Sequence, residues 1–513
     1  MKKHLLLILM MLLPLAMSAQ KVEIDGINYK LNFREKSAMV ISSNNNNRYA
    51  GDVIIPSSIN DSRYDYSVTK IVGSAFENCR ELTSVSIPST VTEIGDEAFH
   101  NCSNLTSIVV EEGNPIYDSR GNCNAIIETA SNKLLHGCNG TVIPNSVRTI
   151  GKQAFYGSGI TSVIIPDEVT GIEREAFRKC NALSYVYIGR DLTNIGYDVF
   201  WECDNPVTVE LNNNAIVSKN YDIQGSTAGI LFGGGHVEEL ILGEDVTSIG
   251  DYAFFRSGMT SVKMSNNVTT IGKHAFFESN RLTSIELSDN LTHIGEWAFA
   301  GCGKLSSITI PQSVKCINLF GFQFCYDLKK VEVNSNEVVS RDGEQFYTLT
   351  SCFGNQVEEY FLGEDVRKIA YIAFAESAKL TTVTLPSNLT CVEDSAFRGC
   401  SSLKDMYCYA AQVPQTGKEI FYSSNYTNAT LHVPATAIDA YKSAEQWKNF
   451  GNIVALTDED PKPAATGIAA PAATQIPIVV GRYTIDGKRI SEPQRGLNIL
   501  KMSDGTTKKV LVK

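Results

Sequence analysis

One stretch of the chain decides the fold: Leu82-Thr-Ser-Val85-Ser-Ile87-Pro88-Ser-Thr-Val91-Thr-Glu-Ile94-Gly95-Asp-Glu-Ala98-Phe99-His-Asn-Cys102. The next copy of this pattern begins at Leu105, 23 residues after Leu82. The phenylalanine near the end of the unit recurs at Phe76, Phe99, Phe155, Phe177, Phe200, Phe254, Phe276, Phe299, Phe322, Phe374, Phe397 and Phe421. Most of these intervals are 22 to 24 residues, a period typical of repeat architectures.

The physical chemistry of one unit predicts how it folds. Apolar and small polar residues alternate toward the end of 82–87, as in a strand with one buried face. Pro88 has no N–H to donate and ends the strand. Asp96 is then expected to cap a short helical turn that brings Phe99 inward under the strand. A single unit cannot bury this apolar face, but stacked units can, so the pattern predicts a solenoid.

Three longer intervals between phenylalanines each contain a weaker copy of the strand. These copies are Gly140-Thr-Val-Ile-Pro144, Val237-Glu-Glu-Leu-Ile-Leu242 and Val357-Glu-Glu-Tyr-Phe-Leu362. The similarity of 212–218 to 334–340 suggests that a block of several units was duplicated. Counting 53–56 and 430–434, about sixteen strands are expected, which at ~4.8 Å each gives an array of about 75 Å.

The ends of the chain predict further segments. An export-signal pattern opens the chain: Lys2 and Lys3, then the apolar run 5–15 and the small residues 16–19. No later segment has ~18 uninterrupted apolar residues, so no transmembrane helix is expected in the mature chain. A signal peptide is expected at 1–19, followed by an N-terminal cap at 20–72 that contains a hairpin from 27–31 and 38–41. The leucine-rich-repeat solenoid and its C-terminal cap are expected at 73–455, and the cap contains a helix at 438–447. A Pro/Ala linker at 456–476 then leads to a small β module of two hairpins at 477–513.

The cysteines follow the repeat. Three residues after each phenylalanine the units carry Cys79, Cys102, Ser158, Cys180, Cys203, Ser257, Ser279, Cys302, Cys325, Ser377, Cys400 and Ser424. A position that accepts either residue requires a small, weakly polar, buried side chain rather than a covalent bond. A disulfide between neighbouring coils, such as Cys79 with Cys102, is an open alternative. The best disulfide candidates are Cys123 and Cys138, which lie outside the pattern.

The repeat resembles the BspA-like, or treponemal-type, leucine-rich repeats over about 73–434. The segment 114–127 and the end near Tyr441 and Trp447 are also similar to this family. The resemblance implies an exported or surface protein of a host-associated bacterium. It further implies adhesion to a host extracellular protein or glycan, or to another bacterial surface protein. The C-terminal segment 477–513 is similar to C-terminal modules of exported Bacteroidetes proteins, which implies a sorting or surface-display role.

Composition narrows the range of partners. The net charge of −11 comes from acidic and basic residues mixed along the chain, which argues against nucleic acid and against anionic membranes as partners. A hydrophobic content of 43% excludes global disorder.

The expected ligand surface is the concave strand face. Its outward positions carry mainly small hydroxyl residues, with scattered charges and a few aromatic rings. The ligand-binding candidates are Tyr185, Tyr187, Glu210, Lys263, Glu286, Glu332 and Tyr407. Tyrosine gives a large contact area at low entropic cost, although each of these residues also fits an ordinary exposed strand position.

Catalytic patterns are absent from the sequence. It has no HExxH, GxSxG or Walker motif, and no CxxC pair. Ser158 in Gly157-Ser158-Gly159 occupies the buried Cys/Ser position, and Gly233-Gly-Gly235 with His236 lacks the lysine and helix of a phosphate loop. We therefore expect no catalytic, cofactor or metal residues and an extracellular binding scaffold. A structural surface component and a carbohydrate-active enzyme are the alternatives.

Overall fold

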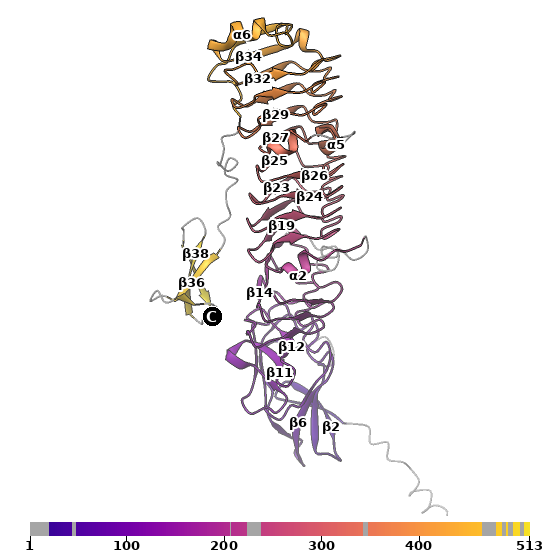
Figure 1. Cartoon of the computed structure of the whole chain (residues 1–513). Helices are drawn as coiled ribbons and strands as arrows, with labels where there is room; N and C mark the ends of the chain where they lie inside the picture. Colours follow the sequence, from indigo (N-terminus) through magenta and orange to yellow (C-terminus); the bar gives the residue numbers. More distant parts are fainter. Residues whose placement is uncertain are drawn as a thin grey trace, which may run out of the picture.

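The computed structural model is an elongated column of stacked coils (Figure 1). It describes residues 20–43, 48–205, 207–222, 237–341, 347–463, 479–484, 489–490, 496–502 and 507–512. The predicted signal peptide, the turn Gly233–His236 and most of the predicted linker lie outside the described residues. No helix among the described residues is long and apolar enough to span a bilayer.

A separate sheet forms the N-terminal end of the column. It comprises β1 (Lys21–Ile24), β2 (Ile27–Asn32), β3 (Ser37–Val40), β6 (Asp65–Ile71) and β5 (Ser58–Asn60), with β8 (Glu93–Ile94) paired to β6. The antiparallel pair β2–β3 is the predicted hairpin. Tyr29 and Tyr66 are fully buried in this sheet, which covers the first coil of the repeat.

The long strands of successive coils pair in parallel along one side, which we call the long-strand face. They form three sheets: β4 (Gly51–Ile54), β7 (Leu82–Ile87) and β9 (Ser107–Val110); then β14 (Ser162–Ile165), β16 (Tyr185–Ile188), β18 (Val207–Leu211), β19 (Val237–Leu242), β21 (Ser261–Met264) and β23 (Ser284–Glu286); then β25 (Ser307–Ile310), β27 (Lys330–Val333), β28 (Glu359–Leu362), β30 (Thr382–Leu385), β32 (Asp405–Cys408), β34 (Thr430–Val433) and β35 (Asn452–Ala455). The predicted strand at Gly140–Pro144 does not form. The N–H of Val142 donates to Cys123 instead, which leaves the first two sheets separate.

A second side is built from shorter strands. They are β10 (Tyr117–Asp118), β11 (Ala125–Glu128), β12 (Lys133–Gly137), β13 (Thr149–Ile150), β15 (Gly171–Ile172) and β17 (Asn194–Ile195); β20 (Ser248–Ile249), β22 (Thr270–Ile271), β24 (His293–Ile294) and β26 (Cys316–Ile317); and β29 (Lys368–Ile369), β31 (Cys391–Val392) and β33 (Gln415–Thr416). The helices α2 (Asn214–Val217) and α4 (Asn336–Val339) each interrupt this side between two of its sheets. These helices come from the two similar segments identified in the sequence.

The third side, which we call the turn side, follows each short strand and corrects the predicted helical turn. Glu97 and Asn101 have φ of 61° and 56°, values that no right-handed helix contains. Backbone N–H groups point along the column instead: the N–H of Phe76 donates to the carbonyl of Ala98 in the next coil at 2.8 Å. Coil-to-coil hydrogen bonds therefore tie all three sides together.

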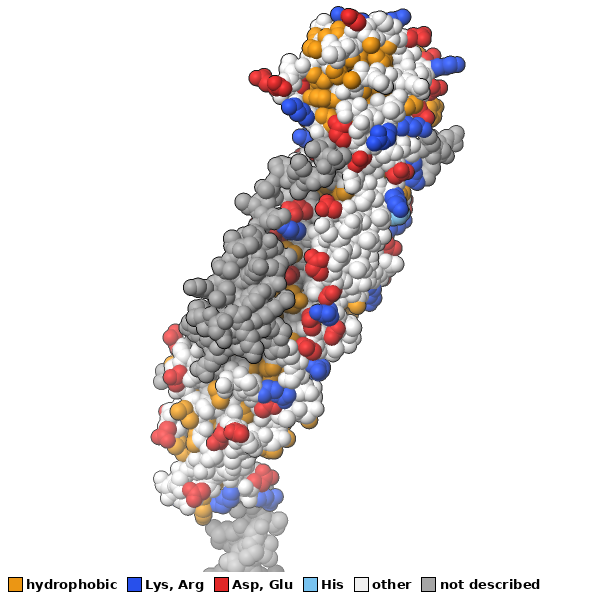
Figure 2. Space-filling model, turned by 60° about the vertical axis from the view of Figure 1, so that its left-hand side comes forward, with side chains coloured by type: hydrophobic (Ala, Val, Ile, Leu, Met, Phe, Trp, Pro, Cys, Tyr) orange, Lys and Arg blue, Asp and Glu red, His pale blue; other side chains and the backbone are white. Residues whose placement is uncertain are grey.

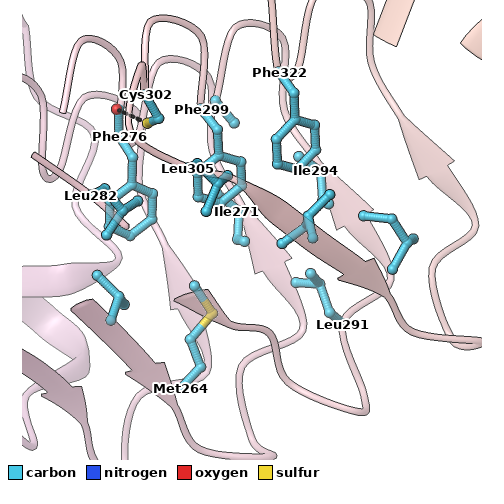
Figure 3. Packing of buried hydrophobic residues seen from close by; sticks show 14 of the residues in the cluster. Met264, Ile271, Phe276, Leu282, Leu291, Ile294, Phe299, Cys302, Leu305 and Phe322 are labelled. Atoms are coloured by element: carbon cyan, nitrogen blue, oxygen red, sulfur yellow. Dashed lines mark hydrogen bonds between the residues drawn. The ribbon is translucent and has the colours of Figure 1, made fainter. Parts of the chain in front are cut away.

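Repeat phenylalanines of neighbouring coils stack on one another and form a spine, of which Figure 3 shows Phe276, Phe299 and Phe322. Adjacent ring centroids lie 5.2 Å apart from Phe254 to Phe276, 5.1 Å from Phe276 to Phe299 and 4.9 Å from Phe299 to Phe322. Phe353 of α5 (Leu349–Phe353) continues the stack at 5.2 Å from Phe322, where the chain has no repeat phenylalanine. Tyr360, edge-on to both Phe353 at 6.1 Å and Phe374 at 5.1 Å, links this ring to the next repeat phenylalanine.

The Cys/Ser position is buried and serves a backbone hydrogen bond. The thiol of Cys302 donates to the carbonyl of Phe276 at 3.3 Å, and the hydroxyl of Ser279 donates to that of Phe254 at 3.2 Å. All thirteen cysteines are free, so the Cys79–Cys102 and Cys123–Cys138 bridges do not form. This arrangement explains why the two residue types exchange: both satisfy the same carbonyl of the preceding coil.

Glycine after the short strand permits close approach of neighbouring coils. A Cβ on Gly272 would lie 2.6 Å from the backbone nitrogen of Asp251, and one on Gly95 would lie 2.3 Å from the nitrogen of Gly73. Both distances are shorter than a van der Waals contact, so the Ile-Gly pair of the repeat reflects backbone packing.

The C-terminal cap closes the column. It contains η2 (Tyr426–Asn428), η3 (Ala435–Ala437) and α6 (Ile438–Ser443), so the predicted helix at 438–447 ends earlier, at Ser443. Trp447 is nevertheless fully buried, with its ring 5.6 Å from that of Phe421. Beyond the cap, β36 (Val479–Thr484) pairs with β37 (Arg489–Ile490), and β38 (Gly496–Met502) pairs with β39 (Thr507–Val512), as the two predicted hairpins require. The remaining short helix, η1 (Arg120–Asn122), lies in the segment 114–127.

Candidate binding surface

The outward side chains of the long-strand face lie in two rows that follow the strand register. One row contains Ile164, Tyr187, Glu210, Ile241, Lys263 and Glu286 in one sheet, and Thr309, Glu332, Phe361, Thr384, Tyr407 and His432 in the next. The other row contains Tyr185 and its counterparts in the same register. Figure 2 turns this side forward and shows acidic and basic side chains interspersed along the column, with hydrophobic side chains gathered at its C-terminal end.

The candidates on β16 and β18 form one cluster. The hydroxyl of Tyr185 donates to Oε2 of Glu210 at 2.7 Å, which fixes the carboxylate on the surface. Tyr187 is half-buried beside them, and burial, followed by the charge of Asp167, raises the pKa of its phenol. Further along the same sheet, Nζ of Lys263 lies 3.4 Å from Oε2 of Glu286. These contacts order the cluster without burying it.

A second cluster lies on the C-terminal sheet. The ring of Tyr407 stacks on His432 with centroids 4.2 Å apart, and Nε2 of His432 lies 3.2 Å from Oδ1 of Asp405. On the neighbouring strands, Nζ of Lys330 lies 4.2 Å from the ring centroid of Phe361, a cation–π contact. Glu332, in the same row, accepts a hydrogen bond from Nδ2 of Asn334 at 3.0 Å.

The structure does not bring all the candidates to one place. Nine strand-to-strand steps separate Tyr187 from Tyr407, which at about 4.8 Å each is about 43 Å. Glu210 and Glu286 are three steps apart, or about 14 Å, and Glu332 lies on the next sheet. Paired carboxylates of glycoside hydrolases lie within about 10 Å, so Glu210 and Glu286 do not form such a pair, whereas Glu286 and Glu332 lie two steps, or about 10 Å, apart on separate sheets.

Three outward positions differ from what the sequence pattern predicts. Ile241 and Phe361 belong to the row but were missed, because the runs 237–242 and 357–362 are apolar at both alternating positions and hide the outward one. Thr384 is fully buried although it occupies an outward position between Phe361 and Tyr407.

The short-strand side has a hollow that sequence reasoning did not find. It has a volume of about 660 Å³ and lies beside β15, β17 and α2, where Glu173, Arg174, Lys219 and Tyr221 line it. None of the predicted ligand-binding residues contributes to it. No group of three or more His, Cys, Asp or Glu side chains is placed to hold a metal ion within the part of the chain that the structure describes.

Comparison with known proteins identifies the family. The chain matches the BspA type leucine rich repeat region, a model with six copies, over residues 56–126, 128–227, 231–352 and 349–444. These matches span well over half of the chain, so the protein belongs to this family of leucine-rich-repeat scaffolds. The predicted resemblance and the predicted repeat fold are thereby confirmed. No curated protein matches the chain.

Solved structures of similar proteins come from several bacteria. A leucine-rich repeat protein from Bacteroides ovatus is 21% identical, with a TM-score of 0.35, covering 84% of this chain and 99% of that one. A leucine rich cell surface protein from Faecalibacterium prausnitzii is 24% identical, with a TM-score of 0.30 and coverage of 67% and 94%. The pneumococcal vaccine antigen PcpA is 14% identical, with a TM-score of 0.28 and coverage of 86% and 99%.

Proposed function

We propose that the protein is exported and acts at the bacterial cell surface as a binding scaffold, an adhesin for a host extracellular protein or glycan or for another bacterial surface protein. One observation supports this role most directly. Along the long-strand face the buried positions repeat almost unchanged, as in Val163, Val186 and Val209, whereas the adjacent outward positions change from coil to coil. The core explains the repeated residues, and recognition of a ligand explains the varied ones.

A binding survey tests this proposal. The chain from residue 20 onward is assayed by surface plasmon resonance against purified matrix proteins, plasma proteins and glycans, alongside the variants Tyr187→Ala and Tyr407→Ala. Because about 43 Å separates the two tyrosines, a compact ligand contacts only one of them, and we expect one variant alone to weaken binding. Tyr371→Ala, an exposed tyrosine on the turn side, is the matched control. Saturable binding supports the scaffold role; no binding in any class, together with self-assembly, argues for a structural surface component.

We also propose that 477–513 serves display at the outer surface. The support is the placement of two hairpins after the expected linker, separate from the repeat. Deleting 477–513 and measuring protease accessibility on intact cells tests the idea, since a surface signal equal to that of the full chain contradicts it.

The scaffold is proposed to lack catalytic activity. The family consists of repeat scaffolds, and the acidic candidates lie on separate strands. Turnover of a glycan by the purified chain that is abolished by Glu210→Gln contradicts this part of the proposal.

A further inference from the structure

One position on the turn side has an unusual distribution of residues. It lies two residues before each repeat phenylalanine, and in all twelve coils its φ is between 51° and 63°. Eight coils carry Ser74, Glu97, Gln153, Glu175, Asp198, Ile372, Ser395 or Glu419 there. The four consecutive coils in between carry Tyr252, His274, Trp297 and Phe320, which we call the aromatic column.

The rings of the aromatic column stack on one another. Centroids lie 4.8 Å apart from Tyr252 to His274, 6.4 Å from His274 to Trp297 and 4.7 Å from Trp297 to Phe320. Phe324, 48% exposed, lies 6.1 Å from Trp297, and Tyr326, 68% exposed, lies 6.3 Å from Phe324. The column and these two flanking rings form a continuous aromatic surface outside the core.

The fold does not require aromatic rings at this position. Left-handed backbone is unfavourable for side chains with a Cβ and is an outlier for bulky ones. Eight other coils hold the same backbone with other residues, seven of which are polar, so the turn forms without a ring. The spine of buried phenylalanines already continues beneath these coils. Every coil adopts this backbone, but only four place bulky rings on it, and rings that the fold does not need point to a role in recognition.

The orientation of the rings determines what fits against them. Tyr252 and His274 are 3° from parallel, and His274 and Trp297 are 11° from parallel, so each ring covers the faces of its neighbours and presents its edge to solvent. Ring edges carry partial positive charge and pair with the negative faces of other aromatic rings. Sugar rings pack their C–H groups on ring faces, and the facing sides of Tyr252, His274 and Trp297 are covered by their neighbours.

Two ion pairs lie beside the column. Nζ of Lys273 lies 2.8 Å from Oε2 of Glu296, and Nε of Arg256 lies 2.7 Å from Oε2 of Glu278. Each pair joins neighbouring coils and leaves little net charge around the rings. An aromatic centre with a balanced rim matches an uncharged partner surface, as in the anchor regions of protein interfaces.

We propose that the aromatic column, with Phe324 and Tyr326, is a docking surface for a partner protein that presents aromatic and aliphatic side chains on an uncharged face. The inference rests on the proposed binding role and adds the side of the column and the chemistry of the partner. This docking surface lies on the turn side and is additional to the long-strand face.

Displayed random peptides test the proposal even though the natural partner is unidentified. The library is panned on the immobilised chain, and selected peptides are measured against the chain and the double variant Trp297→Gln/Phe320→Ser, which introduces residues that Gln153 and Ser74 supply in other coils. We expect enrichment of peptides rich in aromatic residues and poor in charge, with binding weakened about tenfold or more by the double variant. Tyr371→Ser, on the same side but outside the column, is expected to leave binding unchanged. Should the double variant unfold, Phe324→Ser/Tyr326→Ser replaces it, because both of these side chains are exposed.

Other outcomes overturn the inference. Two of them come from the panning: no enrichment of aromatic residues, or equal binding of the selected peptides by the double variant. Binding of a glycan that the double variant loses would make the ligand a sugar. Self-association in analytical ultracentrifugation that the double variant loses would make the occupant a second copy of the chain. Weakened survey binding by Tyr187→Ala or Tyr407→Ala concerns the long-strand face alone, so its absence would contradict the proposed function and not this inference. If the peptides are selected as expected but the survey finds no partner, the docking surface is supported and only the adhesin's proposed class of ligand is contradicted.

Discussion

Replacement of Phe299 tests whether the ring spine holds neighbouring coils together. Phe299 is fully buried and stacks between Phe276 at 5.1 Å and Phe322 at 4.9 Å. Phe299→Leu keeps most of the apolar volume but removes two ring pairs, each worth about 0.5–1.5 kcal/mol, so we expect a loss of about 1–3 kcal/mol in the free energy of unfolding. Phe299→Ala also leaves a cavity and is expected to cost about 3–5 kcal/mol.

Hydrogen exchange is the appropriate assay, because a repeat array can open in parts and a single global unfolding energy is then poorly defined. The backbone N–H of Phe276 bonds to Ala298 at 2.7 Å and that of Phe299 to Gly321 at 2.8 Å, so these two amides report on the coil interfaces directly. Phe324→Leu, at an exposed ring, is the control and is expected to change protection by less than about 0.5 kcal/mol. Equal protection of both amides in the wild-type chain and in Phe299→Ala would refute the reasoning, since the spine would then add nothing to coil-to-coil cohesion.

Three further predictions concern the repeat positions and pH. Cys302→Ser should change the free energy of unfolding by less than about 1 kcal/mol, because Ser279 makes the same hydrogen bond one coil earlier. A larger loss in urea unfolding would show that serine cannot replace cysteine at this position. Gly272→Ala should lower thermal stability by more than about 1 kcal/mol, since its Cβ would lie 2.6 Å from the nitrogen of Asp251, and an unchanged melting temperature would show that the coils separate easily. Burial lowers the pKa of His136 to about 3, so the unfolded chain binds a proton there below its ordinary pKa of about 6.5 while the folded chain does not. The free energy of unfolding should therefore fall as pH drops from about 6.5 toward 3, by up to about 1.4 kcal/mol per pH unit from this group, with no contribution above pH 7. His136→Gln should remove this pH dependence, and parallel pH profiles of the two proteins would show that His136 does not contribute to it.

The strands, the spine and the Cys/Ser position were predictable because their signals are local and recur in every unit. Val85 and Ile87 repeat as buried residues of the strand in most coils, and Phe99 repeats as a buried ring. The buried spine even survives where the pattern breaks, although nothing in the sequence marks Phe353 as its continuation. Its role follows from stacking distance alone.

The turn side was not predictable, for two physical reasons. The left-handed residues two positions before each repeat phenylalanine, such as Glu97 and Trp297, are not the glycine or asparagine that usually signal positive φ. Its hydrogen bonds run to the next coil, so a single unit gives no indication that its N–H groups lack local acceptors. The long-strand candidates illustrate a further limit: the pattern gave their outward orientation, but only the register shows that Tyr187 and Tyr407 belong to separate clusters.

Burial of the thiols makes this fold independent of the redox state of its surroundings. Eleven of the thirteen cysteines are buried, and burial raises the pKa of Cys102, Cys203 and Cys400 to about 12. Oxidation and disulfide exchange proceed through the thiolate, which is scarce at such pKa values and shielded by the coils above and below. The column therefore needs no oxidising catalyst to reach its native state and has no disulfide isomers to sort. The same structure is expected to persist whether the medium around it is anaerobic and reducing or rich in oxygen.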